Sequence, residues 1–547
     1  MKTLSLKKPL FSLGLDFGTQ SARGILLHVS NGKIISEETY AYPHGVIDQF
    51  LPSPKKTHLP DEFALQHPLD YLQAFTFIAR SLLKKSKIDP EQIIGIGIDF
   101  TSCTLLPVKK DGTPLCLLTP FQNDPQAWVK LWKHHAAQPQ ANRFLEIALK
   151  RKEKFIERYS QSISCEWFFP KALEIIEKSP AVYKACDQII EAQDWLVWQL
   201  TGTEKRSACA AGYKAFWSKK RGFPSPNYFK EVHPKLENII SEKIGNIFYT
   251  PGEKAGLLTL DWAQRTGLSP KTAVAVSIID AHSAVLGCGV AQPNEMVLCI
   301  GTSACHLIHH SKEKNVPGIC GTVQDGILPN YFAYEAGQAA VGDLFEWFIK
   351  QIQYFQPHLH PKKIFEKLNQ AAIKMKPNPT GLIALDWWNG NRSILANPSL
   401  RGVITGYHLS TQPHHIYRAL LESTAMGSLK IIDSFEKHKI SIQKLIVTGG
   451  IAQRNPLFMQ ILSDVIGKKI TVPDYSEICA RGAALLGAFA ANAYPTLEQT
   501  TKKMTPQKNK IFSPNNKNHK IYKSIYKKYL KLHDYFGKNL NNSIGKK

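Results

Sequence analysis

Residues 13–23, which read LGLDFGTQSAR, constrain the fold more than any other part of the chain. A short apolar run leads into Asp16, a Gly-Thr turn follows, and a second apolar run leaves from Gly24. This order predicts a β-hairpin whose turn offers a carboxylate, a hydroxyl and several backbone N–H groups. Backbone donors at such a turn hold phosphate oxygens, and a carboxylate at a strand end can hold a hydrated magnesium ion. Asp-x-Gly-Thr also closes ordinary hairpins, so this segment alone leaves both interpretations open.

A second hairpin of the same kind is predicted at residues 296–303, which read MVLCIGTS, with its second strand beginning near His306. It repeats the apolar strand and the glycine-containing turn but lacks the aspartate. Two phosphate-binding hairpins on two halves of one chain predict a nucleotide held between duplicated domains. The chain thereby resembles actin, the heat-shock proteins and the sugar kinases, which share this plan but not one function.

Length and patterning predict an α/β protein of two domains. A chain of 547 residues is too long for one hydrophobic core, and apolar strand-like runs alternate with helical ones. We expect two duplicated actin-like (ribonuclease H-like) domains around a nucleotide and sugar cleft. We place residues 1–272, with the first hairpin, on the sugar side. Residues 273–547, with the second hairpin, Asp280 and a C-terminal helix, form the nucleotide side.

The composition favours a cytoplasmic protein. No run of about 20 apolar residues predicts a membrane helix, and residues 1–8 lack the apolar segment of a signal peptide. The ten cysteines include no Cys-x-x-Cys pair. They are therefore interpreted as small buried side chains in a reducing compartment.

The formal net charge of +24 is concentrated near the end of the chain. Residues 502–547 hold thirteen lysines and one acid, Asp534, which together give +12. No helix-turn-helix, ribonucleoprotein motif or zinc finger accompanies them, so we do not expect a nucleic-acid partner. Attraction of an anionic nucleotide or sugar phosphate is the alternative. Apolar residues at helical spacing predict an amphipathic helix that packs on the protein through Ile521, Ile525, Tyr529, Leu532 and Phe536.

Asp280 is the first candidate for catalysis. It ends the apolar run 274–279, and small and polar residues follow it. A carboxylate there can accept the proton of a hydroxyl during phosphoryl transfer, and it can equally cap the helix that begins at Ala281. Lys214 and Glu335 stand among small residues near predicted cleft loops. Each of them could bind sugar hydroxyls or be an ordinary surface charge.

Two further segments can border a ligand. Gly449 and Gly450 follow the apolar run 445–448, and glycine there lets a planar base or a ribose approach the backbone. A plain strand-to-helix turn explains the two glycines equally well. Residues 385–392, which read LDWWNGNR, form an aromatic and polar cluster that either lines a pocket or fixes an inter-domain loop.

Taken in order, these segments resemble the FGGY carbohydrate kinases. Residues 164–171, which read SCEWFFPK, resemble the first signature of that family. Residues 402–406, which read GVITG and are followed by His415, Ala419 and Glu422, resemble the second. Within the family the longer stretches are most similar to the L-ribulokinase branch, and they span nearly the whole chain: residues 99–104, 130–137, 279–282, 301–306, 386–393 and 532–537.

The resemblance implies ATP- and magnesium-dependent phosphorylation of L-ribulose at its 5-hydroxyl, a step of L-arabinose catabolism. It implies that Asp280 is the general base and also contacts the sugar, and that Asp16 lies near the metal through water. The other implied contacts are Ser102, Lys214 and Glu335 with the sugar, Gly18, Thr19, Gln20, Gly301, Thr302 and Ser303 with the phosphates, and Gly449 and Gly450 with the nucleoside. Closure of the two domains over the sugar would exclude water.

Two positions depart from the family pattern. Arg481 stands where an apolar residue is usual near the adenine pocket, which leaves the contacts of the base open. Ser102 occupies a position that often holds a smaller residue, which could tune the preference for one sugar.

Rival functions stay open at the level of the sequence. A kinase of the same family could act on D-ribulose, ribitol or xylulose, and a sugar or nucleotide sensor could use the same fold without catalysis. Asp16, Asp280 and both hairpins favour an enzyme, because a sensor has no need of the base. A chaperone-like ATPase is disfavoured because no peptide-binding β-domain follows the two halves. The expected partners are a small sugar and ATP, and a homodimer is an open alternative to a monomer.

Overall fold

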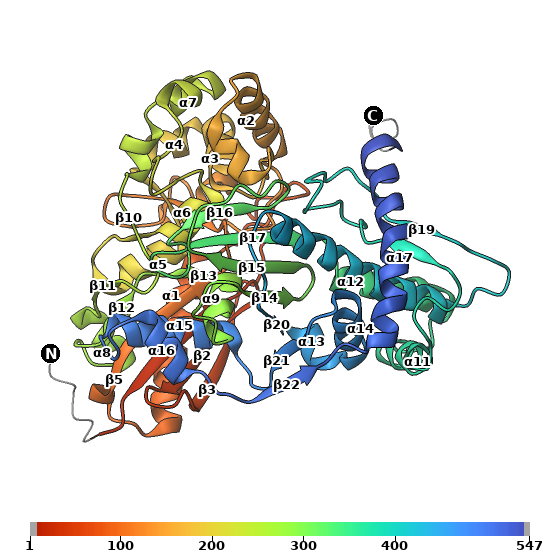
Figure 1. The fold of residues 1–547 in the computed structure, drawn as a ribbon. Coiled ribbons are helices and arrows are strands. Elements are labelled where there is room, and N and C mark those ends of the chain that lie inside the picture. Colours follow the sequence, from red (N-terminus) through yellow and green to blue (C-terminus); the bar gives the residue numbers. More distant parts are fainter. Residues whose placement is uncertain (1–7, 541–547) are drawn as a thin grey trace.

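Two seven-stranded sheets lie at the centre of the computed structural model, which describes residues 8–540 (Figure 1). The first sheet runs in the order β11-β12-β5-β1-β2-β3, and β13 also pairs with β5. Its strands are β1 (Phe11–Phe17), β2 (Ser21–His28), β3 (Ile34–Ala41), β5 (Ile93–Phe100), β11 (Lys254–Leu257), β12 (Ala273–Ala275) and β13 (Ile278–Ile279).

The second sheet runs in the order β16-β17-β15-β14-β20-β21-β22. Its strands are β14 (Glu295–Ile300), β15 (Ala304–His310), β16 (Gly321–Gln324), β17 (Phe332–Gln338), β20 (Lys444–Thr448), β21 (Ile470–Pro473) and β22 (Asn509–Phe512).

The two sheets repeat one arrangement. Each begins with three antiparallel strands, which are β1, β2 and β3 in the first sheet and β14, β15 and β17 in the second. Two parallel strands follow on the other side, β5 and β12 or β20 and β21, and an antiparallel strand, β11 or β22, ends the series. Both predicted hairpins are the first two strands of their sheets. The prediction of a duplicated α/β fold is confirmed.

Strand β5 is buried along nearly its whole length, as expected of a parallel strand that is covered on both faces. One cover is helix α15 (Ile478–Ala490), which comes from the far end of the sequence. A Cβ atom on Gly97 would lie 1.8 Å from the carbonyl oxygen of Ala483, and one on Gly95 would lie 2.0 Å from that of Gly487. Glycine is required in β5 because the helix backbone packs directly on the strand.

The same close packing joins α15 to α9 (Asp280–Gly287), the helix that follows β13. A Cβ atom on Gly287 would lie 1.9 Å from the carbonyl oxygen of Ile478, and one on Gly482 would lie 2.0 Å from that of Ser283. Helix α9 also contacts β14 and β15 of the second sheet. The two helices therefore connect the two sheets.

The predicted division after residue 272 stays a prediction. In the structure β12 and β13, which follow that point in the sequence, pair with β5 of the first sheet. Helix α15, although it lies late in the sequence, also packs on the first sheet.

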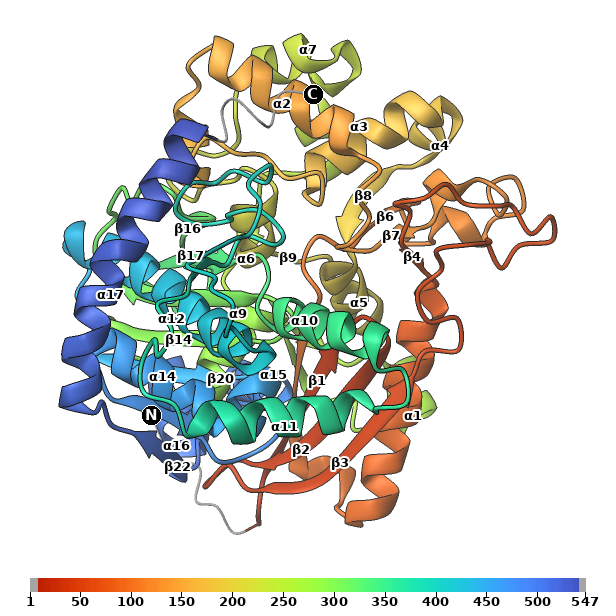
Figure 2. The same cartoon turned by 90° about the vertical axis from the view of Figure 1, so that its right-hand side faces the viewer.

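A mainly helical layer lies above the first sheet in both views (Figures 1 and 2). It consists of a small sheet of β4 (Leu65–Gln66), β7 (Val129–Lys130), β6 (Leu105–Val108) and β8 (Gln188–Glu191), and of helices that include α2 (Gln138–Lys150), α3 (Phe168–Lys178), α4 (Pro180–Ala185), α6 (Ala208–Lys214) and α7 (Pro226–Val232).

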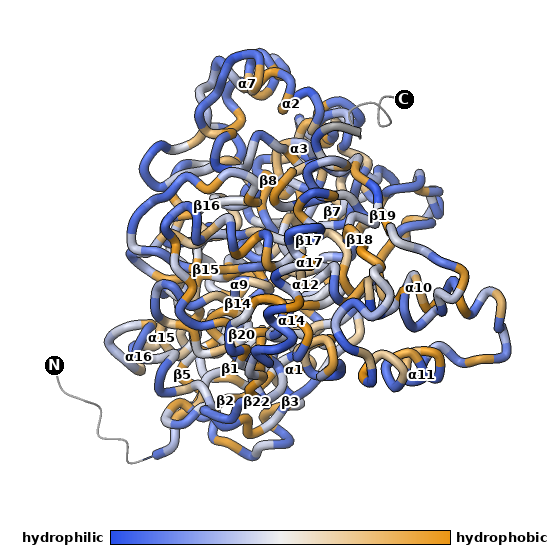
Figure 3. Tube along the Cα trace, turned by 45° about the vertical axis from the view of Figure 1, so that its right-hand side comes forward, coloured by the Kyte–Doolittle hydropathy of each residue, from blue (hydrophilic) through white to orange (hydrophobic). Residues whose placement is uncertain are grey.

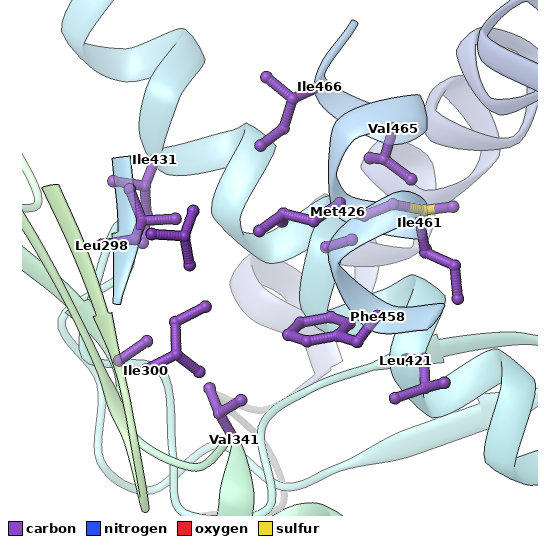
Figure 4. Close-up of a cluster of buried hydrophobic side chains, with 14 of the residues drawn as sticks. Leu298, Ile300, Val341, Leu421, Met426, Ile431, Phe458, Ile461, Val465 and Ile466 are labelled. Atoms are coloured by element: carbon purple, nitrogen blue, oxygen red, sulfur yellow. The ribbon is translucent and has the colours of Figure 1, made fainter. Parts of the chain in front are cut away.

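The second sheet is covered by α12 (Pro413–Lys437) and α14 (Pro456–Ile466). In Figure 4, Leu298 and Ile300 from β14 face Met426 of α12 and Phe458 of α14. All four side chains are buried in one hydrophobic cluster. Figure 3 shows hydrophobic residues running through the central strands, with hydrophilic residues common in the outer loops and helices.

The Lys-rich end of the chain forms helix α17 (Asn516–Asp534), as predicted, and packs on α14 and α12. Its buried face differs by one position from the predicted one. Tyr522, and not Ile521, packs inward together with Ile525 and Tyr529, and Ile521 is 37% exposed. Tyr522 is selected because its hydroxyl donates to Glu422 at 2.8 Å, a bond that isoleucine cannot make. Within residues 8–540 no helix is both long and apolar enough to cross a membrane.

We predict that Gly97→Ala lowers the apparent unfolding midpoint. The added methyl would meet a backbone oxygen that cannot rotate away, so the free energy of unfolding should fall by about 3 kcal/mol or more. Thermal and urea unfolding measure the change. Gly301→Ala is the control, because its Cβ meets no atom within 4 Å; equal midpoints for the two variants would contradict the packing described here.

Candidate active site

The turn of the first hairpin is fixed from outside by side chains and backbone of the neighbouring loops. Gln66 donates to the carbonyl oxygen of Thr19 at 2.8 Å, and the Trp132 indole donates to the Thr19 hydroxyl at 3.0 Å. The backbone N–H of Tyr42 donates to the carbonyl oxygen of Gln20 at 3.0 Å. Gly18 and Thr19 are half-buried and Gln20 is exposed. The turn is thus rigid and open to a ligand.

The turn of the second hairpin is fixed through the start of helix α10 (Gly342–Phe355). The backbone N–H of Gly342 donates to the carbonyl oxygen of Gly301 at 3.0 Å, and that of Val341 donates to Thr302 at 2.9 Å. Gly301 and Thr302 are exposed and Ser303 is half-buried. These contacts occupy the carbonyl groups of the turn and leave its surface accessible.

Gly449 and Gly450 lie beside this second hairpin, at the end of β20. Thr448 pairs with Cys299 of β14, and Gly449 has φ of +100°, so that a Cβ there would lie 2.3 Å from the carbonyl oxygen of Ile300. Gly450 begins the short helix α13 (Gly450–Arg454). The structure therefore brings the predicted phosphate and nucleoside residues of the second half together at the carboxyl ends of the neighbouring strands β14 and β20.

Three carboxylates stand at the ends of three neighbouring strands. Asp16 of β1 pairs in register with Asp99 of β5, and Ile279, which precedes Asp280, pairs with Phe100. Asp99 is fully buried, and within the described residues neither of its oxygens receives a hydrogen bond. Burial, and then the charges of Asp16 and Asp280, raise the pKa of Asp99 well above its usual value. The place of Asp99 at the end of an apolar strand points at the crevice where α/β proteins bind ligands, but this position alone predicts no specific role for it.

Asp280 has one carboxylate oxygen available for a substrate. Its Oδ1 accepts the backbone N–H of Ala281 at 2.6 Å, and in the described part of the chain Oδ2 makes no hydrogen bond. The alternative of a simple helix cap is wrong, because Ile279 is the N-cap residue and Asp280 is the first residue of α9. Burial, and then the charge of Asp16, raise the pKa of Asp280 to about 7.

Lys214 and Glu335 form an ion pair between the two halves of the chain. Lys214 ends α6, and its Nζ lies 3.2 Å from both oxygens of Glu335 in β17. The two side chains are only 10% and 7% exposed, so the alternative of ordinary surface charges is wrong. His282 Nε2 lies 3.4 Å from Glu335 Oε2. Burial alone would raise the pKa of Glu335, but Lys214 and then His282 hold it below its usual range.

A cavity of about 480 Å³ opens next to this ion pair. Residues from both halves line it, and the loop at 389–398 forms one wall, which confirms that the aromatic and polar cluster borders a pocket. Its polar lining includes Glu62, His135, Ser164, Glu166, Lys214, Glu335, Asn389, Asn391 and Arg392. Ser102 and Asp280 are not part of this lining.

Comparison with known proteins decides the family. Residues 11–287 match the N-terminal domain of the FGGY family of carbohydrate kinases, and residues 296–491 match its C-terminal domain. This chain belongs to the FGGY family of carbohydrate kinases. It is therefore a phosphotransferase that uses ATP and acts on a carbohydrate.

Curated relatives match almost the whole kinase. The ribulokinase of Bacillus licheniformis is 46% identical over 532 residues, which are 95% of this chain and 96% of that protein. The ribulokinase of Halalkalibacterium halodurans is 44% identical over 539 residues, which are 97% of this chain and 96% of that protein. Among solved structures, gluconate kinase from Lactobacillus acidophilus has a TM-score of 0.79 at 15% identity, covering 97% and 99%. Glycerol kinase from Plasmodium falciparum with ADP has a TM-score of 0.75 at 18% identity, covering 96% and 98%; both confirm the fold.

Ser102 of the kinase sits in the turn that follows β5, and a buried lysine fixes this turn. Lys171 Nζ donates to the carbonyl oxygens of Cys103 and Leu131, each at 2.7 Å, from a fully buried position. Lys171 belongs to the segment that resembles the first family signature. Sequence analysis assigned it no role because both of its partners are backbone atoms, which leave no trace in the sequence.

Arg481, the residue that departs from the family pattern, is held by two neighbours in the structure. Its Nη1 donates to the carbonyl oxygen of Gly32, and its guanidinium lies 4.9 Å from the centre of the Tyr475 ring. Gly32 lies between β2 and β3, so this contact joins α15 to the first sheet. Arg481 is buried and helps to connect the two halves.

A second group of possible metal ligands lies at His44, His67 and Asp70. The two rings are stacked, with centroids 4.3 Å apart and planes 13° apart. Because the lone pairs of an imidazole lie in the plane of its ring, two stacked rings do not direct them at one ion. His44 Nδ1 instead lies 2.7 Å from Asp70, and His67 caps the helix that begins at Pro68. We interpret this group as structural.

We predict that Gly301→Ala weakens ATP binding without unfolding the kinase. The position has open space around a new Cβ, so the fold should be unchanged, but the methyl would occupy the surface of the turn. The KM for ATP should rise at least about tenfold, which corresponds to about 1.4 kcal/mol. Steady-state kinetics measure it, and an unchanged KM for ATP would remove residues 301–303 from the phosphate site.

Proposed function

We propose that this kinase transfers the γ-phosphoryl group of ATP to the 5-hydroxyl of L-ribulose, with Asp280 as the general base. The main observation is Asp280, a half-buried carboxylate whose Oδ2 makes no hydrogen bond in the described part of the chain. Its pKa is raised to about 7, and the charges of Lys214 and Glu335 act on it. A general base works best when its pKa lies near the working pH. Relatives that match almost the whole chain and bear the name ribulokinase support the choice of sugar.

In the proposed reaction each half of the chain has its own task. The sugar hydroxyl gives its proton to Asp280 as its oxygen attacks the γ-phosphorus of ATP, and ADP leaves. Lys214 and Glu335, with Ser102, hold the other hydroxyls of the sugar and fix the reacting one in place. The phosphates of ATP lie at residues 18–20 and 301–303, and its nucleoside lies against Gly449 and Gly450. Positioning and charge stabilisation supply most of the catalysis in such reactions.

The carboxylates at the strand ends fit a magnesium ion, which this reaction class requires. Buried oxygens without hydrogen-bond donors, such as those of Asp99, are the ligands that hard cations prefer. Asp16 would hold the ion through water, with Asp99 beside it. When bound, the ion supplies neutralisation of phosphate charge.

A non-catalytic sensor on the same fold is the rival from another class. The grouping of Asp16, Asp99 and Asp280 disfavours it, because closely placed carboxylates with raised pKa values cost stability and are typical of catalytic sites. A coupled assay of ADP release with L-ribulose, D-ribulose, xylulose, ribitol and no sugar separates the alternatives. We expect the highest kcat/KM with L-ribulose. If another sugar is the best substrate, that sugar replaces L-ribulose in the proposal. If none of the sugars is phosphorylated, the kinase proposal fails and the non-catalytic sensor is the remaining alternative.

We further propose a cytoplasmic location, because all ten cysteines are free thiols, as is usual in a reducing compartment. A homodimer stays a prediction that light scattering of the purified kinase tests.

We predict that Asp280→Asn lowers kcat by at least about a hundredfold, which is about 2.7 kcal/mol of barrier. The amide keeps the size of the side chain but cannot accept the proton. The dissociation constant of ATP, measured by calorimetry, should change little. Turnover close to that of the wild type would rule out Asp280 as the base.

We predict that kcat/KM for the sugar falls as the pH drops through about 7. The base must be ionised, and its raised pKa means that protons occupy it at a higher pH than an ordinary aspartate. A cation bound beside Asp16 would move the fall to lower pH without changing its direction. The pH profile between 5 and 9 measures this, and the residual activity of Asp280→Asn should lack the same fall.

A further inference from the structure

The cavity beside Lys214 and Glu335 is larger than the proposed mechanism needs, and its outer part carries charged groups without an assigned role. Glu166 and His135 come from the first half of the chain. Arg392 comes from a loop of the second half that lines the same cavity. Charged groups of both signs that line one cavity of about 480 Å³ are candidates for binding a polar ligand.

The backbone around Arg392 is fixed by its neighbours on both sides. The backbone N–H of Gly337 in β17 donates to the Ser393 hydroxyl at 3.1 Å. Asn391, the other neighbour, exchanges two backbone hydrogen bonds with Asn397, each at 2.9 Å. The side chain of Arg392 extends along Gly337, where a Cβ would lie 3.3 Å from its Cδ.

The guanidinium of Arg392 is available for a ligand. Arg392 is an exposed residue, although it lines a cavity whose neighbouring positions Asn391 and Ser393 are buried. Within residues 8–540 its guanidinium makes no hydrogen bond and no ion pair. Five N–H donors on a fixed backbone therefore face the cavity without an acceptor.

Glu166, which lines the same cavity, is the matching acceptor. It lies in the turn before α3, where its backbone N–H donates to the Ser164 hydroxyl at 3.2 Å. Its Oε1 lies 3.2 Å from His135 Nε2, and the side chain is 27% exposed. Its Oε2 makes no hydrogen bond in the described part of the chain. Burial raises the pKa of the Glu166 carboxyl, but His135 and then Arg392 lower it further, so that it lies below its usual range. Glu166 is therefore ionised at neutral pH.

Glu335 lies between these groups and the proposed base. The charges that act on Asp280 include Lys214 and Glu335, whereas those that act on Arg392 include Glu166 and Glu335. Arg392 and Glu335 line the same cavity, and Asp280 does not. A sugar whose reacting hydroxyl lies at Asp280 and whose middle lies at Glu335 therefore extends its far end toward Arg392.

We propose that Arg392 and Glu166 bind the C1–C2 end of the ketose and thereby select a keto sugar. The C2 carbonyl oxygen only accepts hydrogen bonds and the guanidinium only donates them, so the two match. The C1 hydroxyl can accept from Arg392 and donate to Oε2 of Glu166. This inference rests on the proposed function, since it takes the reacting hydroxyl to be the one at the other end of the sugar.

The two residues should affect binding more than chemistry. They contact the sugar far from the reacting hydroxyl, and a contact that is equal in the bound sugar and in the transition state changes KM and not kcat. A hydrogen bond to a charged group corresponds to about a tenfold to hundredfold change in KM. Lysine at position 392 keeps the charge but not the planar fork, so Arg392→Lys should recover only part of the loss.

The test compares L-ribulose with 1-deoxy-L-ribulose, which keeps the 5-hydroxyl and the C2 carbonyl but lacks the C1 hydroxyl. The enzymes are the wild type, Arg392→Ala, Arg392→Lys, Glu166→Gln and, as control, Arg265→Ala. Arg265 lies on the surface helix α8 (Leu260–Thr266), paired with Asp261. We expect the wild type and the control to disfavour the deoxy sugar about tenfold or more. In the Arg392→Ala and Glu166→Gln variants, KM for L-ribulose should rise and most of this discrimination should vanish.

Unchanged unfolding midpoints and an unchanged KM for ATP would show that the variants are folded. If those variants keep the wild-type KM for L-ribulose, or keep its discrimination against the deoxy sugar, the inference is wrong while the proposed function stands. If the wild type prefers another ketose, the proposed sugar is wrong, and the same comparison with that ketose and its 1-deoxy form decides the inference. A wild type that prefers pentitols or phosphorylates no ketose overturns both.

Discussion

The direct backbone packing of α15 on the first sheet is the contact on which the rest of the structure depends. Gly14, Gly95 and Gly97 leave the strand surface bare, so that carbonyl oxygens of the helix lie where side chains would otherwise stand. Helix α15 in turn packs on α9, which begins with Asp280. A single bulky side chain in this contact would therefore displace Asp280 together with the two sheets.

The residues of the proposed site lower the stability of the fold and at the same time make the site reactive. Burial raises the pKa values of the three neighbouring carboxylates, and the charge of Asp16 raises those of Asp99 and Asp280 further. Such a group opposes folding until protons or a cation offset its charge. The ion pair of Lys214 with Glu335 is the opposite case, because each partner stabilises the charged form of the other. One part of the cleft is thus prepared to take up a proton, and the adjoining part is not.

The elements that depend only on residues close together in the sequence were predicted from the sequence. The two hairpins follow from apolar runs and turn residues, and the structure has them at the predicted places. The apolar run 274–279 forms the two short strands β12 and β13 and not one strand, and Asp280 begins helix α9. Lys214 and Glu335 were ambiguous because residues 121 positions apart show no pattern until the fold pairs them. Asp99, Lys171 and the proposed sugar contact Arg392 had no predicted role for a related reason, since they face a distant carboxylate, backbone oxygens and an open cavity. The pairing of α15 with a strand near the N-terminus was equally beyond any periodicity.

The ion pair of Lys214 with Glu335 also affects the release of the product in the proposed reaction. Lys214 and Glu335 together carry no net charge, so this pair exerts little attraction on an anion. A neutral sugar loses nothing by this, because it binds through hydroxyl groups. In the proposed reaction, however, the new phosphate forms near the carboxylates of Asp16, Asp99 and Asp280. These carboxylates repel the sugar phosphate more than the neutral sugar, which favours departure of the product over its rebinding.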